Sequence, residues 1–286
     1  MTPEMPTIGT DLCGPEEVAD TEAVGAVARA YQLLRTALGV SHVPTVYRML
    51  ATHPAFFVEF VDCSLPAVER YMTDDVPARL RAAARSSLPT GKTRINEAER
   101  LSDVWELLDR YNRANPLNLL LTLLLAGPDA VLRDDVMRPP LPDPPSGEGV
   151  DELLADIRAC HGGVTVPGLW REMFGATGSA RPIWESVRAS AEEGHVVRSR
   201  DAVFDAAREA VPEQDHLTWL VEEHSPQDRA GIDRIVGWFP SGISAMIAEI
   251  EIMKTVLASS HLRASAELDE RRGRRLPSQI DPNRHS

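Results

Sequence analysis

The sequence predicts an all-α protein, and three observations support this prediction. Ala, Leu, Arg and Glu dominate the 286 residues, whereas alternating runs of Val, Ile, Thr and aromatic residues bounded by turn residues are scarce. Apolar residues recur instead at helical spacing, and hydrophobic residues make up 43% of the chain, enough to fill a core. A long internal repeat further indicates two similar helical halves.

The first half contains the start and stop signals of several helices. Thr21 is expected to cap a helix that ends near Leu38, where Gly39 can terminate it. Pro44 and Pro54 each suit the first turn of a helix, because proline lacks the N–H that this turn leaves unpaired. Periodicity predicts three further helices in this half, at 76–87, 96–111 and 116–126.

A proline-rich segment, residues 138–149, separates the halves, and its five prolines exclude both a helix and a central strand. It is predicted to link a first repeat at 17–137 to a second at 150–262. Residues 1–16 and 263–286 have little apolar content and are expected to be disordered. The helices predicted in the second repeat lie near 150–160, 166–176, 182–194, 199–210, 226–237 and 240–261.

The repeat itself is visible in two tracts at one spacing. VPTVYRML, which starts at Val43, returns as VPGLWREM from Val166, an offset of 123 residues. LRAAARSSLP from Leu80 returns at the same offset as VFDAAREAVP from Val203. The period is too long for a solenoid unit of about 20 to 50 residues, so it predicts two domain-sized halves. A pseudo-twofold would bring these halves face to face, and a site is expected between them.

Composition excludes several classes of function. The formal charge of −13 disfavours nucleic acid and an anionic membrane surface, because both are bound through clustered basic residues. Three cysteines without a CxxC pair indicate reduced thiols and no disulfide. The N-terminus has no basic start followed by an apolar run, so a cytoplasmic protein is expected. We expect a small, anionic substrate and leave a homodimer open.

Neither a phosphate loop, a dinucleotide fingerprint, an HExxH motif nor a nucleophile elbow occurs, so the sequence carries no strong catalytic signature. Candidate residues follow from position instead. Asn115 precedes Pro116, which fits an N-cap, although its amide could also hold a water or a carboxylate near a helix N-terminus. His161, in the loop CHGGVTVP, could be a general base or could complement a helix C-terminus.

Thr165 is either a neighbour of a helix cap or a hydrogen-bond donor to substrate. Glu172 lies on the helix that follows and is either solvated or a second candidate base. Tyr47 and Trp170 hold equivalent repeat positions; such aromatics usually lie in cores, but across a pseudo-twofold they would line the interface. The substrate-binding residues predicted around this interface are Thr45, Tyr47, Arg48, Val166 and Trp170.

Three tracts, VPTVYRMLATHPAFF, YNRANPLNLLLTLLLAG and GISAMIAEIEIMKTVLASSH, resemble the group I (DehI-type) 2-haloacid dehalogenases. The resemblance spans most of residues 20–260, including the repeat and the linker. It implies an all-α protein of two similar halves, with a cofactor-independent active site between them. In that family an aspartate activates the water that displaces halide directly from C2, and an asparagine helps to hold this water.

The resemblance assigns the water-holding asparagine to Asn115. It places Val166 at the aspartate, Thr165 at the serine before it, and Thr45 at a pocket tryptophan. Because valine cannot accept a proton, the chain is expected to be inactive, or nearly so, as a standard hydrolytic 2-haloacid dehalogenase. Two hypotheses follow: a divergent hydrolase or lyase acting on a small carboxylate, with His161 or Glu172 activating water, or a non-catalytic binding or accessory protein that kept the cleft.

Overall fold

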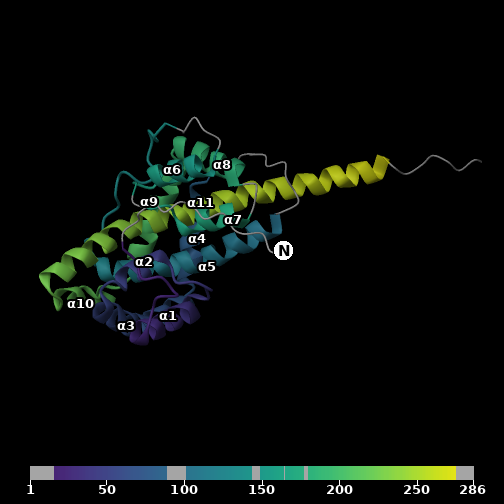
Figure 1. Ribbon diagram of the computed structural model, residues 1–286. Coiled ribbons are helices and arrows are strands. Elements are labelled where there is room, and N and C mark those ends of the chain that lie inside the picture. Colours follow the sequence, from purple (N-terminus) through teal and green to yellow (C-terminus); the bar gives the residue numbers. More distant parts are fainter. Residues whose placement is uncertain (1–15, 89–100, 144–148, 164, 177–179, 275–286) are drawn as a thin grey trace, which may run out of the picture.

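The computed structural model describes residues 16–88, 101–143, 149–163, 165–176 and 180–274. Within these ranges the chain forms eleven α-helices and one 3₁₀ helix, and it has no β-strand beyond an isolated bridge between Val136 and His161 (Figure 1). The predicted all-α class is therefore confirmed.

The helices follow one another in chain order, five before the linker and six after it. The first group comprises α1 (Gly25–Leu38), α2 (Thr45–Leu50), α3 (Pro54–Thr73), α4 (Val76–Ser86) and α5 (Leu101–Ala126). The second group comprises α6 (Val150–Cys160), α7 (Gly168–Ala176), α8 (Ala180–Glu192), α9 (His195–Ala210), α10 (Thr218–Glu222) and α11 (Pro226–Arg274), with the 3₁₀ helix at Glu213–Asp215.

Helix α1 begins later than its sequence suggests. Thr21 lies in a turn, and the residue before the helix, Val24, makes no side-chain capping bond. The C-terminal signal was correct: Gly39 follows the helix in the left-handed conformation (φ 65°), which glycine adopts without steric penalty.

Helix α5 corrects the largest error of the sequence prediction. Two helices were expected, with Asn115 capping the second, but α5 runs without interruption through Pro116. An internal proline leaves the carbonyl four residues earlier without its helical donor. Here that carbonyl belongs to Asn112, and the Arg81 guanidinium donates to it at 3.3 Å. A side chain from α4 thus supplies the missing hydrogen bond.

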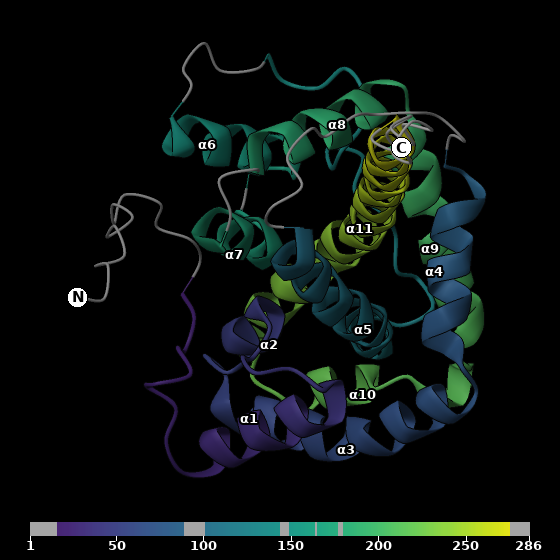
Figure 2. The same cartoon turned by 90° about the vertical axis from the view of Figure 1, so that its right-hand side faces the viewer.

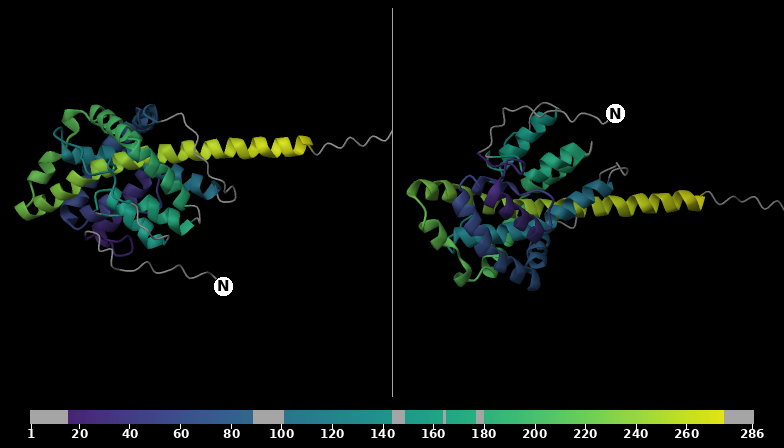
Figure 3. Two further views of the ribbon diagram at one scale, coloured as in Figure 1. Left: turned by 90° about the horizontal axis from the view of Figure 1, so that it is seen from above. Right: turned by 60° about the horizontal axis from the view of Figure 1, so that its bottom comes forward.

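Helix α11 likewise continues through Pro240, where two helices were predicted, and reaches Arg274. The helix thus includes 263–274, which the sequence prediction assigned to a disordered tail, while 1–15 and 275–286 lie outside the described residues. In Figures 1 and 3 this helix projects well beyond the rest of the protein. Its apolar stretch, residues 226–258, is long enough to span a membrane, but 89% of the most apolar window is buried inside the protein.

Helices α5 and α11 pack against each other at the centre, and the other helices surround them (Figure 2). One apolar core contains α1 to α4 with the C-terminal part of α5, and the other contains α6 to α8 with the C-terminal part of α11. Each central helix also contributes to the opposite core: Val104 to Tyr111 of α5 pack with α6 to α8, and Ile232 to Ile247 of α11 pack with α1 to α4. The contacts are reciprocal, since α5 meets α7 and α11 meets α2.

The described part of the linker runs over the surface, and two buried arginines of the second half hold the chain within the linker and just before it. Arg200 donates from Nη1 to the carbonyl of Val136 at 2.6 Å, and Arg188 donates to the carbonyl of Pro142. Arg188 also pairs with the buried Asp156. These bonds fix the chain on both sides of Pro139 and Pro140.

Candidate functional site

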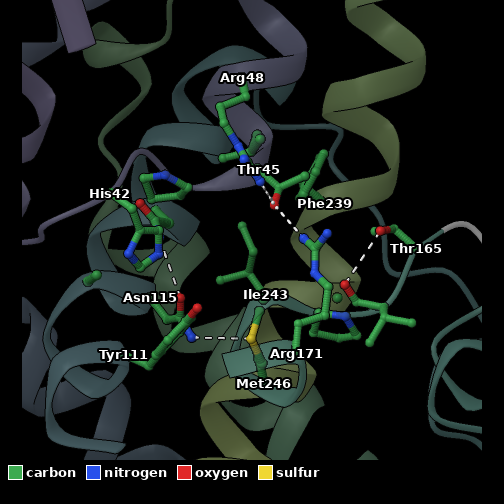
Figure 4. A pocket seen from close by; sticks show the side chains of 18 of the residues that line it. His42, Thr45, Arg48, Tyr111, Asn115, Thr165, Arg171, Phe239, Ile243 and Met246 are labelled. Carbon is green, nitrogen blue, oxygen red and sulfur yellow. Dashed lines mark hydrogen bonds between the residues drawn. The ribbon is translucent and has the colours of Figure 1, made fainter. Parts of the chain in front are cut away.

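A cavity of about 320 Å³ lies where α2, α7 and the loops before them meet the middle of α5 and α11 (Figure 4). Its walls are mainly apolar, with a few polar groups between them. Seven of the nine residues predicted from sequence line it: Thr45, Arg48, Asn115, His161, Thr165, Val166 and Glu172.

Asn115 reaches the cavity from the interior of α5 rather than from a helix start. Its Nδ2 lies 3.6 Å from the Met246 sulfur, a weak acceptor, so this N–H is available to a ligand. Its Oδ1 accepts from Asn118 at 3.4 Å, and the Asn118 Oδ1 in turn accepts from the Tyr47 hydroxyl at 3.0 Å. Buried side chains therefore fix the Asn115 amide.

Tyr47 and Trp170 do not line the cavity, in contrast to the prediction that they form its walls. Tyr47 is 1% exposed and supports Asn118 from behind. Trp170 is fully buried and donates from Nε1 to Glu249 at 2.9 Å. Both aromatics belong to the cores of their halves, where aromatics at helical spacing usually lie.

His161 lines the cavity but is almost completely buried, with 1% of its surface exposed. Nδ1 lies 2.7 Å from the Ile157 carbonyl and Nε2 lies 2.7 Å from Glu249. Burial lowers its pKa, but the Glu249 charge and these two hydrogen bonds outweigh burial and raise it above the usual value of 6.5. Both ring nitrogens thus face oxygen acceptors, so His161 offers no free lone pair to a water proton.

Two arginines at equivalent repeat positions converge on the Thr45 hydroxyl. Arg48 donates to it at 3.1 Å and Arg171 at 3.4 Å. Arg48 also pairs with Glu17 at 3.4 Å. The described part of the chain gives Arg171 no carboxylate partner, although this guanidinium points into the cavity (Figure 4). Arg171 stands in the second repeat tract, but it was not predicted from sequence to bind substrate.

Glu172 belongs to a group of charged and aromatic side chains on the opposite wall. It accepts from Arg110 at 2.6 Å and from the Tyr111 hydroxyl at 2.6 Å, and it lies 3.4 Å from His42 Nε2. Sequence reasoning missed His42, Tyr111 and Arg110. One signal was present: the repeat offset places His42 at the position of Thr165.

Thr165 and Val166 form the wall that precedes α7. The Thr165 hydroxyl donates only a long bond, 3.4 Å, to the Val166 carbonyl, so it is free to contact a ligand. Val166 is 5% exposed and presents an apolar side chain at the position that the resemblance assigns to an aspartate.

The described residues contain no cluster of His, Cys, Asp or Glu that could hold a metal ion. Cys63 and Cys160 are free thiols, and Cys13 lies outside the described ranges. Burial raises the pKa of Cys160 to about 12, with a further contribution from Asp156, so this thiol does not act as a nucleophile at neutral pH.

Comparison with known proteins identifies the fold. No protein-family profile and no curated protein sequence matches the chain. Solved structures do: a D-2-haloacid dehalogenase mutant has a TM-score of 0.69 at 12% identity, and the same type of enzyme in complex with L-LA has 0.67 at 14%. A mutant in complex with D-2-CPA scores 0.66 at 15%. Each comparison covers 85% of this chain and 96% of the other.

Proposed function

We propose that this protein is an enzyme that binds a 2-substituted monocarboxylate in the central cavity and, without a cofactor, replaces the substituent at C2 with a hydroxyl from water. Arg171 carries the proposal. Its guanidinium faces a mainly apolar cavity and donates a hydrogen bond to the Thr45 hydroxyl. Among the described residues it has no carboxylate partner. A guanidinium in this setting is suited to a ligand carboxylate, which it can bind through two parallel hydrogen bonds.

The size of the cavity indicates a substrate with an apolar chain. Its volume of about 320 Å³ is room for roughly ten water molecules. Octanoate has about that many non-hydrogen atoms, whereas 2-chloropropionate has little more than half as many. Apolar side chains on α11, including Phe239, Ile243 and Met246, would contact such a chain while Arg171 and Thr45 hold the carboxylate.

The proposed chemistry differs from standard 2-haloacid dehalogenation in the group that activates water. Val166 cannot activate water, and His161 is engaged with Glu249. Asn115 retains an amide N–H directed at the cavity, which can hold a water or a substrate oxygen. Water activation therefore requires another group. The remaining histidine and carboxylate side chains at the cavity lie on the wall that carries Glu172.

Val166 also favours a second candidate function. A protein that bound a carboxylate without transforming it would need Arg171 and the apolar walls but no base. Turnover separates the two functions. Bromide release from 2-bromooctanoate at a rate typical of enzymes, about 1 to 10³ per second, supports the enzyme. Binding without release supports the non-catalytic protein.

Calorimetric titration with octanoate tests the carboxylate site directly. Arg171→Gln removes a charged hydrogen-bond donor worth about 1.5 to 3 kcal/mol, so binding should weaken roughly 10- to 150-fold. Arg79→Gln, an exposed change on α4, is the matched control and should bind like the natural protein. Equal octanoate affinity in the Arg171 and Arg79 variants would contradict the proposal.

A further inference from the structure

His42 is the one histidine at the cavity that has a carboxylate neighbour and yet stays accessible. It lies in the loop between α1 and α2, its side chain is 37% exposed, and it lines the cavity. Nε2 lies 3.4 Å from Glu172 Oε1. The ring also packs against Tyr111, with 5.8 Å between ring centroids. In Figure 4, His42, Tyr111 and Asn115 occupy one side of the cavity, across from Arg171 and Thr165.

The carboxylate beside His42 is held in place from α5. The Tyr111 hydroxyl donates to Glu172 Oε1 and Arg110 donates to Oε2, each at 2.6 Å. These two bonds orient Glu172 so that Oε1 faces the imidazole. If the ring carries its proton on Nε2, toward Glu172, its Nδ1 is left with a free lone pair. A histidine oriented by a carboxylate is a common arrangement for moving a proton.

The internal repeat relates the loop that carries His42 to the loop before α7. The offset of 123 residues relates His42 to Thr165 and Val43 to Val166. Both loops precede short helices that border the same cavity, so equivalent positions approach it from opposite sides. The second loop presents a hydroxyl and an apolar side chain, whereas the first presents an imidazole. Of these two loops, only the first presents a side chain that can accept a proton.

We propose that His42 is the general base that activates water in this cavity, with Glu172 as its positioning residue. The proposal rests on the proposed function. The water oxygen forms a bond to C2 of a 2-substituted carboxylate while the bond from C2 to the substituent breaks, and the substituent leaves with the electron pair. The water proton passes to His42 and then to solvent, giving a 2-hydroxy acid.

The protonation state of His42 suits this role. Burial lowers its pKa below the usual 6.5, and the arginines lower it further, while the carboxylates oppose them. The imidazole is therefore neutral at pH 7 and can accept a proton. The charged groups that act on it are Glu172 from α7, Arg110 from α5, Arg48 from α2 and Asp20 from the segment before α1.

Bromide release from 2-bromooctanoate, measured against pH, tests this assignment. His42→Gln should lower kcat by about 10² to 10⁴ while octanoate binding persists, since loss of a general base affects the chemical step. His224→Gln, which changes a histidine that packs on Phe56 away from the cavity, is the matched control. It should keep both the rate and the octanoate affinity of the natural protein.

Glu172→Gln separates positioning from a merely structural role. The Glu172 charge raises the pKa of His42, so its removal should move the acidic limb of the pH profile to lower pH. Nitrogen NMR of the imidazole should show the same fall in the His42 pKa, and octanoate should perturb this ring in the natural protein. A structural role would reduce the rate without moving the limb.

The outcomes distinguish this inference from the proposed function. Failure of octanoate to bind overturns both. Octanoate binding with no bromide release by the natural protein, or with release unaffected by His42→Gln, overturns the assignment of the base and leaves the carboxylate site standing. If octanoate binds but leaves the nitrogen NMR signals of the His42 ring unchanged, the assignment of the base is likewise overturned.

Discussion

Glu249 offers a quantitative test of the buried ion pair that removes His161 from the candidate bases. This carboxylate is fully buried on α11 and accepts from His161 Nε2 at 2.7 Å and from Trp170 Nε1 at 2.9 Å. It thereby joins α11 to the end of α6 and to α7. Glu249→Met removes both acceptor oxygens but keeps an apolar side chain of similar length.

The expected cost of Glu249→Met follows from the two groups that lose a partner. Trp170 N–H and His161 Nε2 would remain buried and unpaired, at about 1 to 3 kcal/mol each. The free energy of unfolding should fall by about 2 to 6 kcal/mol, which lowers Tm by roughly 4 to 20 °C in a chain of this size. Thermal or urea unfolding followed by circular dichroism measures it.

Glu249→Gln is the matched control because glutamine can satisfy both partners. Its carbonyl accepts from Trp170, and its NH₂ donates to a neutral His161, so its cost above neutral pH should stay below about 1 kcal/mol. The pKa of His161 is raised on folding, so the stability due to the ion pair is complete below about pH 6.5 and declines as pH rises through the folded pKa.

The stability deficit of Glu249→Gln should therefore be larger in acid than in base. A deficit independent of pH, or equal stability of the Met and Gln variants, would refute the buried ion pair. Glu249→Gln should also keep bromide release, because His161 is not the base. A loss of turnover with the fold intact would return His161 to that role.

Three further changes probe the cavity. The natural protein should release halide from 2-chloropropionate only slowly, and Val166→Asp, which installs a carboxylate at the cavity wall, should increase this release; an unchanged rate in a folded variant would contradict the role assigned to that position. Asn115→Ala and Thr165→Val should abolish turnover or octanoate binding with little change in the circular dichroism spectrum, and full function in both would remove them from the site. Ile243→Trp overfills the cavity at a cost of about 1 to 3 kcal/mol, so calorimetry should show octanoate binding weakened more than acetate binding, and equal losses would speak against an apolar chain site.

Local signals in the sequence predicted most of the helices. Pro54 and Pro226 stand at helix starts, Gly39 ends a helix, and periodicity located α4 and α6 closely. Proline misled the prediction only inside the two central helices. Pro116 leaves the Asn112 carbonyl without its helical hydrogen-bond donor, and Arg81 of α4 supplies one instead. No local sequence pattern reveals a partner on another helix.

The candidate site was predictable where the repeat pointed to it. Thr45, Arg48, Thr165 and Val166 line one cavity because equivalent tracts meet there. His42 was missed because a single histidine in a short loop carries no motif, and its partner Glu172 comes from the other half. Tyr47 and Trp170 were misplaced because the orientation of a buried aromatic depends on hydrogen bonds to distant helices.

The most direct test of the central claim is a crystal structure of the protein with octanoate. We expect the octanoate carboxylate within hydrogen-bonding distance of Arg171 and the Thr45 hydroxyl, with the hydrocarbon chain against Ile243 and Met246 and its C2 atom facing His42 and Asn115. An empty cavity at saturating octanoate, or a carboxylate bound away from Arg171, would contradict the proposed site.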